Sequence, residues 1–187
     1  VTLSREQLSF ARERLARAGL SPLVELELRD YRDIGGSYSH IVSIEMLEAV
    51  GERYWQTFFG YLNRLLVPGG SAAIQTIVID DACFEQYRAG TDFIQQYIFP
   101  GGMLPSPAKL GQLADDNGFR VERCDFFGGD YAETIRRWRE RFELNLAAIE
   151  QQYDTSFIRL WRLYLAYCEA GFDAGRINVV HLKLVKE

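Results

Sequence analysis

The 187-residue sequence predicts an α/β fold, with helices packed on both faces of a sheet. Segments with helical periodicity alternate with segments of strand periodicity along the whole sequence. Residues 70–80, GSAAIQTIVID, form the most continuously apolar strand segment, which is typical of a strand buried on both faces. Hydrophobic residues make up 48% and charged residues 25%, so we expect one packed domain.

Apolar spacing and cap residues predict four helical regions. The first follows Ser4 as N-cap and ends at Gly19, and the second, from residue 53, closes with Pro68-Gly69-Gly70. The inward side chains of the second are Trp55, Phe58, Phe59, Leu62 and Leu65. The third runs from about Ser106 to Asn117. The fourth covers about 131–170, with an apolar stripe of Trp138, Phe142, Leu146, Ile149, Phe157, Leu160, Tyr164 and Tyr167.

Alternating or continuous apolar residues predict five strands between these helices. The predicted strands are Leu23 to Leu28, a segment from Tyr38 that ends near Ser43, and residues 70–80, 119–127 and 177–187. The strand ends matter most, because ligands of open α/β sheets bind outside the carboxyl ends of the strands.

Composition and charge exclude several classes of protein. The net charge of -5 and the pI near 5.2 give no footprint for nucleic acid. No apolar run approaches the roughly 20 residues of a membrane span. The cysteines Cys83, Cys124 and Cys168 lie far apart, without metal-ligand spacing, and are expected to be reduced thiols in a cytoplasmic protein.

Polar residues gather at the predicted strand ends: Asp30, Asp33, Glu45, Glu48, Gln75 and Asp80. Helix capping and solvated loops are the bland alternative for such residues, and we accept it for Asp33, Glu52 and Asp81. Glu48 is different, because it falls inside the apolar run EMLEAVG just past a strand end. A carboxylate there needs hydrogen bonds or a raised pKa, so we treat Glu48 as a candidate functional residue.

The segment YIFPGGMLPS, Tyr97 to Ser106, reads as a shaped loop with apolar side chains. Its two prolines fix the backbone locally, whereas its Gly-Gly pair permits left-handed turns. Taken alone, such a loop is better explained by the filling of a gap in the core.

Several motifs carry a resemblance that extends over essentially the whole sequence. They are VTLSREQLSFARERLARAGL, DYRD, HIVSIEMLEAVGERYW, LVPGGSAAIQTI, DFIQQYIFPGGMLPS, GGDYAETIRRW and YLAYCEAGF. Together they resemble the cyclopropane-fatty-acyl-phospholipid synthases, including the mycolic acid cyclopropane synthases, which are S-adenosylmethionine-dependent class I methyltransferases. The resemblance implies methylene transfer to the cis double bond of a phospholipid acyl chain, at the inner face of the membrane.

The resemblance also implies site residues. In that family a bound bicarbonate serves as the base and is held by a Glu, a His, a Tyr and a backbone amide. Glu48 matches the glutamate, Tyr131 the tyrosine and Ile77 the amide, whereas Gln75 stands at the histidine position. An amide can still donate hydrogen bonds there but cannot carry a proton.

The resemblance places substrate and cofactor contacts as well. The apolar loop, with Tyr97, Phe99, Met103 and Leu104, is expected to wall an acyl pocket beside the cofactor, under a helical lid at about 131–170. No Gly-rich cofactor loop is present, so the sequence reads as a single partial catalytic domain that lacks the first two strands of its Rossmann-like fold. The remaining cofactor-binding candidates are Asp30, Tyr31, Ser43 and Glu45.

Further expectations follow from the missing strands. The 187 residues alone are not expected to bind S-adenosylmethionine tightly or to be active. The sheet edges left bare are expected to pair in a homodimer by strand exchange, or to close by rearrangement.

Two alternatives to a cyclopropane synthase stay open. One is a methyltransferase that methylates a carbon of the acyl chain without closing a ring, and the other is a non-catalytic interaction module. A nucleic-acid methyltransferase is less favoured, because neither a basic stripe nor an NPPY-like motif is present.

Overall fold

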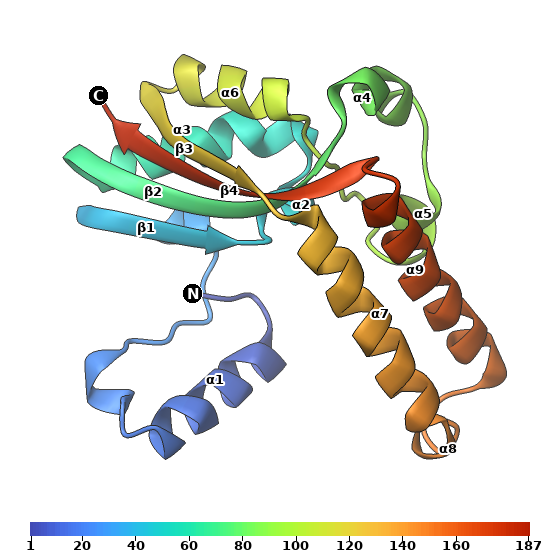
Figure 1. The fold of residues 1–187 in the computed structure, drawn as a ribbon. Coiled ribbons are helices and arrows are strands. Elements are labelled where there is room, and N and C mark those ends of the chain that lie inside the picture. The colour runs from blue at the N-terminus through green and yellow to red at the C-terminus, as the bar shows by residue number, and fades with distance from the viewer. The chain divides into compact units, whose positions relative to one another are not determined.

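The computed structural model describes all 187 residues and divides into two compact units, Val1–Ser37 and Tyr38–Glu187. Figure 1 shows the ribbon of both. The prediction of a single partial domain stays a prediction, whereas the α/β class is confirmed by the mixed fold of the second unit.

The first unit is built around helix α1 (Arg5–Arg17), followed by the short helices η1 (Ser21–Leu23) and η2 (Tyr31–Asp33). Ser4 caps α1 as predicted, because its side-chain oxygen accepts a hydrogen bond from the Gln7 amide. The predicted strand from Leu23 to Leu28 is wrong, because only Leu28 makes a bridge, with Thr2. The alternation gave that segment strand propensity, but a strand also needs a neighbour along its length.

The second unit contains one four-stranded sheet, which confirms the four remaining predicted strands. Its strands are β1 (Tyr38–Ile44), β2 (Leu66–Ile79), β3 (Phe119–Phe126) and β4 (Ile177–Lys186), in the order β1-β2-β4-β3. Strand β1 runs parallel to β2, and β4 runs antiparallel to both β2 and β3. The register places Gln75 between Ile44 and His181, and His181 opposite Asp125.

Helices of the second unit connect and cover these strands. They are α2 (Leu47–Val50), η3 (Glu52–Tyr54), α3 (Trp55–Leu65), α4 (Asp81–Arg88), α5 (Phe93–Tyr97), α6 (Pro107–Asp116), α7 (Gly128–Leu144), α8 (Leu146–Ile149) and α9 (Thr155–Asp173). Helices α3 and α6 lie along the same face of the sheet (Figure 1). All five side chains predicted to face inward from α3 are buried.

The two faces of the sheet differ in burial. Ala72, Ile74, Thr76 and Val78 of β2 are buried on the face that α3 and α6 cover. On the opposite face Val42 is 68% and Ile44 58% exposed. The predicted burial of both faces is therefore wrong for this part of the sheet, because alternate residues of one strand face opposite sides and only one side is packed here.

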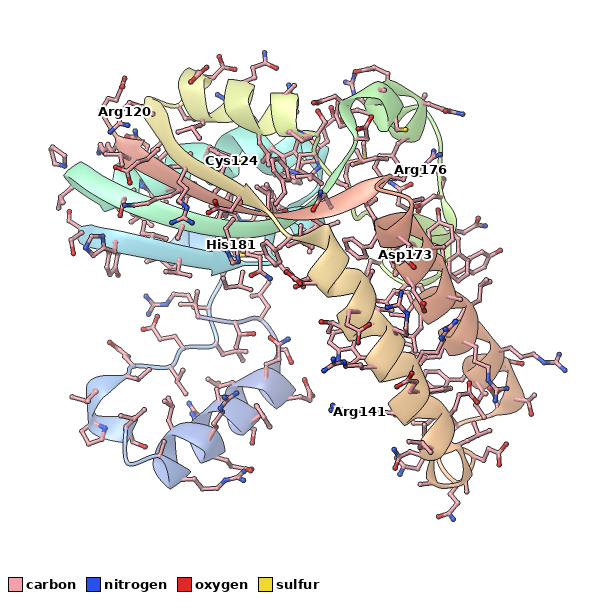
Figure 2. The ribbon with its side chains drawn as sticks, in the orientation of Figure 1. Arg120, Cys124, Arg141, Asp173, Arg176 and His181 are labelled. Carbon is pink, nitrogen blue, oxygen red and sulfur yellow. The ribbon has the colours of Figure 1, made fainter.

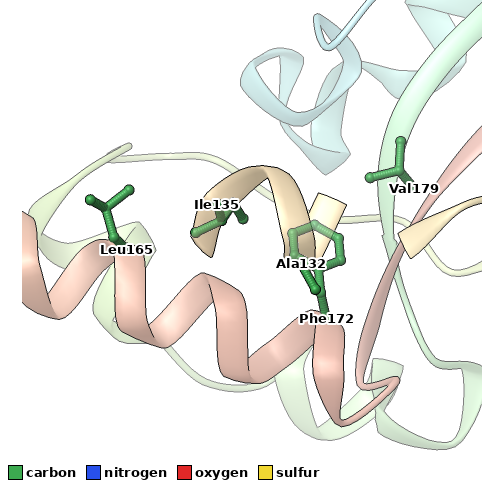
Figure 3. Close-up of a cluster of buried hydrophobic side chains, with 5 residues drawn as sticks. All are labelled: Ala132, Ile135, Leu165, Phe172 and Val179. Atoms are coloured by element: carbon green, nitrogen blue, oxygen red, sulfur yellow. The ribbon is translucent and has the colours of Figure 1, made fainter. Parts of the chain in front are cut away.

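The predicted helical region at about 131–170 is divided into α7, α8 and α9, with Asn145 closing α7. Helices α7 and α9 run side by side (Figure 1). Near the sheet they bury a cluster of Ala132, Ile135, Leu165 and Phe172 together with Val179 of β4 (Figure 3). This cluster anchors the base of the helix pair to the strand that also carries His181. None of the helices has both the length and the apolarity that a bilayer crossing requires.

Candidate active site

Three polar side chains meet at the point where β1 ends beside β2. Gln75 Nε2 lies 2.9 Å from Glu45 Oε1 and 2.8 Å from the Tyr131 hydroxyl oxygen. The Tyr131 hydroxyl donates to the same Glu45 oxygen. Glu45 follows β1, Gln75 belongs to β2 and Tyr131 lies in the first turn of α7, so the sheet and the helix pair meet in this cluster.

A histidine of the neighbouring strand completes the cluster. His181 Nε2 lies 2.8 Å from Gln75 Oε1, and Figure 2 shows His181 on β4. The Phe127 ring packs on His181 with ring centroids 4.3 Å apart and also contacts Tyr131 at 5.8 Å. Phe127 thus supports both polar groups from the start of α7.

Tyr131 is placed by a close backbone approach. The Asn178 side chain of β4 accepts a hydrogen bond of 2.7 Å from the Gly128 amide at the first position of α7. A Cβ at position 128 would lie 2.6 Å from Asn178 Oδ1 and 3.2 Å from Asn178 Cα, so a larger residue there would displace the Asn178 side chain. This contact sets where α7 leaves the sheet and therefore where Tyr131 lies.

Glu48 lies beside the cluster on the short helix α2. Its Oε1 accepts a hydrogen bond of 2.5 Å from the Ile77 amide, and its Oε2 is buried without a hydrogen-bond partner. Burial is the main cause that raises the pKa of Glu48, and the charge of Glu45 adds to it, while the Ile77 amide acts in the opposite direction. The sequence analysis requires hydrogen bonds or a raised pKa for a carboxylate in an apolar run, and Glu48 has both.

The backbone at Glu45 is unusual. With φ at 49°, Glu45 is the only residue other than glycine that has a positive φ. Its amide continues the ladder by donating to the Gln75 carbonyl at 2.9 Å. Residues held in this region carry backbone strain of about 1–2 kcal/mol and are found most often at functional sites.

The four cofactor-binding candidates are divided between the units. Asp30 and Tyr31 belong to the first, and Ser43 and Glu45 to the second. The Asp30 carboxylate accepts from Arg32, through its Nε at 2.9 Å and its Nη2 at 2.7 Å, and this contact lowers the pKa of Asp30 to about 2. Ser43 Oγ is buried without a hydrogen-bond partner, as suits a hydroxyl that contacts a ligand.

The candidates of the apolar loop are tied to the helix that carries Glu48. The Met103 amide donates to the Glu48 carbonyl at 3.0 Å, which fixes the loop against α2. Tyr97 and Phe99 are each 58% exposed, and Leu104 is half-buried. Met103, which the resemblance places with them in the wall of the acyl pocket, is instead buried: its side chain is 8% exposed and its sulfur accepts a hydrogen bond from Gln95.

Aromatic rings extend this apolar region along α9. Phe99 makes an edge contact with Tyr164 at 6.3 Å between centroids, and Phe93 contacts Tyr167 at 5.6 Å. The series continues through Trp161 and Phe157 of α9 to Tyr153, just before that helix. The loop and the α9 part of the predicted stripe, Phe157, Tyr164 and Tyr167, therefore carry a continuing set of aromatic contacts, called the aromatic surface below.

Two contributions to the site do not follow from the sequence. Glu45, a predicted cofactor contact, accepts hydrogen bonds from Gln75 and Tyr131. His181 is the other. It lies in a predicted strand, but its partner stands 106 residues earlier, and only the register of β2 with β4 brings the two together.

Comparison with known proteins assigns this sequence to a family. The model of the mycolic acid cyclopropane synthetase family matches residues 1–182. The tuberculostearic acid methyltransferase UfaA1 of Mycobacterium tuberculosis is 43% identical over the whole of this sequence, and the cyclopropane-fatty-acyl-phospholipid synthase of Escherichia coli K12 is 35% identical over 96% of it. The 187 residues span only 44% of the length of each of these relatives.

Solved structures agree in fold. The mycolic acid cyclopropane synthase CmaA1, in complex with SAH and CTAB, superposes with a TM-score of 0.85 at 25% identity, covering 99% of this protein and 68% of that one. The cyclopropane synthase MmaA2 of Mycobacterium tuberculosis gives 0.83 at 23% identity over the same shares. The predicted likeness to class I methyltransferases is thereby confirmed for the fold.

Proposed function

This chain belongs to the mycolic acid cyclopropane synthetase family, and we propose that the full protein transfers a methyl group from S-adenosylmethionine to the cis double bond of an unsaturated phospholipid acyl chain. The product proposed is a cyclopropane fatty acid. The convergence of Glu45, Gln75 and Tyr131 at the end of β1, beside Glu48 and the Ile77 amide, is the observation that carries the proposal.

The chemistry makes two demands on the site. S-adenosylmethionine supplies an electrophilic sulfonium methyl group, and attack by the alkene leaves a carbocation. The site must exclude water, which would trap the cation, and must hold an acceptor for one proton. The aromatic surface around Phe99 and Tyr164 supports the first demand, and the strand-end carboxylates support the second.

Cofactor contacts are proposed for Ser43 and Asp30, each in its own unit. The Ser43 hydroxyl has no partner inside the protein and suits a ligand contact. The Asp30 carboxylate is already oriented by Arg32 and keeps its negative charge, which suits a hydroxyl-rich partner such as a ribose. Tyr31 of the same motif is a proposed neighbour of the adenine.

Methylation without ring closure is the second candidate. It is favoured by the relative with 43% identity, which is named a tuberculostearic acid methyltransferase. Both candidates share the transfer of the methyl group to an alkene carbon and differ in how the cation is resolved.

The remaining partners are proposed from exposed apolar side chains. A phospholipid substrate implies that the protein works as a peripheral protein at the inner membrane face, and the exposed rings of Tyr97 and Phe99 suit that contact. A homodimer by strand exchange is supported by the edge position of β1, where Val42 and Ile44 are exposed.

The test is product analysis in cells that express the complete protein. Mass spectrometry and proton NMR of the phospholipid acyl chains should show a cyclopropane ring, whereas a methyl branch would select the second candidate. Purified protein should form S-adenosylhomocysteine only when unsaturated lipid is present. Unchanged acyl chains together with no S-adenosylhomocysteine would contradict both candidates.

A further inference from the structure

The donors that the resemblance assigns to a bound bicarbonate are all occupied by groups of the protein itself. Gln75 Nε2 donates toward the Glu45 carboxylate and the Tyr131 hydroxyl, which lie side by side. The Tyr131 hydroxyl donates to Glu45, and the Ile77 amide donates to Glu48. Each of these three donor groups already faces an acceptor of the protein, and the Glu45 carboxylate lies where Gln75 and Tyr131 converge, so the residues do not fit a free anion there in this arrangement.

We propose that the Glu45 carboxylate is the base of the reaction and replaces the bicarbonate that the resemblance implies. This inference rests on the proposed methyl transfer. Glu45 is held by the same amide and hydroxyl that were expected to hold the anion, and its side chain reaches them from a neighbouring strand end.

The hydrogen bonds around Gln75 all point toward Glu45. The Gln75 Nε2 must face Glu45, because an ionised carboxylate only accepts, and Oε1 therefore faces His181. His181 must then donate from Nε2, which assigns the proton to that ring nitrogen. The series of donors from His181 through Gln75 ends on the Glu45 oxygen and stabilises its negative charge.

The other groups around Glu45 are compatible with this role. Glu48 on α2 takes up the Ile77 amide, and the raised pKa of its buried carboxyl lowers its repulsion of Glu45 whenever it is protonated. Tyr164 on α9 has its pKa raised to about 12, by burial first and by Glu45 last, and stays neutral. Tyr131 and His181 donate from α7 and β4.

Backbone geometry gives a second, independent reason. Glu45 holds its position at a φ of 49°, where a glycine would be unstrained. A side chain kept at such a position indicates that the side chain is needed there. Tyr131, which donates to Glu45, packs with Tyr164 against the same buried cluster of α7 and α9, and Tyr164 also contacts Phe99 of the aromatic surface proposed for the acyl group.

The proposed step balances as follows. The alkene π electrons form a carbon–carbon bond to the sulfonium methyl, the electron pair of the broken carbon–sulfur bond stays on sulfur, and the second alkene carbon becomes a cation. The electron pair of one C–H bond of the new methyl then closes the ring onto that cation. Its proton passes to the Glu45 carboxylate.

The test compares the complete protein with its Glu45→Gly and Glu45→Gln variants, in buffer freed of carbon dioxide and in buffer with bicarbonate. Wild-type methyl transfer should be the same in both. Glu45→Gly should lose about 10²-fold in rate and regain part of it with bicarbonate, which fits the space left. Glu45→Gln should lose as much without rescue. Glu140→Gln, an exposed residue of α7, is the matched control and should retain full activity.

Wild-type activity that requires bicarbonate, or a Glu45→Gly variant as active as the wild type without it, would overturn the proposal. Carbon-13 NMR with labelled bicarbonate and the 187-residue protein gives a readout independent of activity. Binding to Glu45→Gly alone supports the proposal, and binding to the wild type or to neither protein overturns it. Absence of any methyl transfer would refute the proposed function, while the NMR comparison would still decide the role of Glu45. Glycine relieves the backbone at φ 49°, so thermal melting should show no loss of stability in Glu45→Gly.

Discussion

Glu169 on α9 and Glu48 on α2 are both withdrawn from water, but their surroundings are opposite. Glu169 pairs with two arginines of α7, Arg136 at 3.1 Å and Arg139 at 3.3 Å. Arg136 also reaches Asp173 of α9 at 3.2 Å. No ion pair joins Glu48, whose neighbours are the Ile77 amide and the Glu45 carboxylate.

The difference separates a structural carboxylate from a reactive one. Two cations compensate the burial of Glu169, so its charge ties α7 to α9. Burial of Glu48 is opposed only by hydrogen bonds, from the Ile77 amide, its own amide and Thr76, and by no cation, so its pKa is raised. Ion pairs of Glu169 with two arginines therefore join α7 to α9. Glu48, just past the end of β1, has no such cation, and its raised pKa favours the protonated form.

The largest effect is expected from removing the donors at the strand end. Gln75→Leu takes away the amide donor that faces Glu45 and Tyr131, and it leaves His181 without its acceptor. The rate of methyl transfer should fall about 10²-fold, since general base function depends on a positioned acceptor. Steady-state formation of S-adenosylhomocysteine measures it. Gln152→Leu, at an exposed loop residue, should match the wild type, and an equal loss in both variants would contradict the assignment.

The next effect concerns stability in the helix pair. Glu169→Gln removes the charge that two arginines share, and the free energy of unfolding should fall by about 1–2 kcal/mol. The value lies below that of a fully buried pair because the arginine side chains are 37% and 42% exposed. Urea unfolding measures the change. A variant as stable as the wild type would show that the pairing contributes nothing.

Glu48→Gln should raise the free energy of unfolding, by less than Glu169→Gln lowers it. The pKa of Glu48 is raised by folding from its ordinary value of 4.5. Between pH 4.5 and the raised pKa, the folded protein therefore keeps a proton that the unfolded protein has released. Wild-type stability therefore falls as pH rises from 4.5 through the folded pKa, and the neutral amide escapes that loss. Melting temperatures should favour Glu48→Gln increasingly with pH across this window. A gain that is constant with pH would argue against a titrating Glu48.

Some of the site could be predicted from sequence because motifs fix local positions. The sequence predicts Glu48 and Gln75 at strand ends, the resemblance adds the Ile77 amide, and the buried face of α3 follows from helical spacing. The prediction of a strand from Leu23 to Leu28 is wrong because alternating apolar residues indicate only strand propensity. A strand also needs a neighbouring strand to pair with, and only Leu28 makes a bridge.

Long-range register and local backbone explain what could not be predicted. His181 meets Gln75 through the pairing of β4 with β2, and no local pattern states which strands pair. Glu45 turns toward Tyr131 from a φ of 49°, a conformation that sequence favours for glycine and not for glutamate. The division of the long helix near Asn145 likewise depends on how α9 returns against α7.

The most direct measurement is a carbon-13 titration of the Glu48 carboxyl in the 187-residue protein, with Glu48→Gln identifying the resonance. Our account predicts a midpoint above the ordinary value of 4.5, because burial without a cation disfavours the charged form. The midpoint should move down when Glu45→Gln removes the neighbouring charge. A Glu48 midpoint at or below 4.5 in the wild type would contradict the claim that the strand end holds an uncompensated carboxylate.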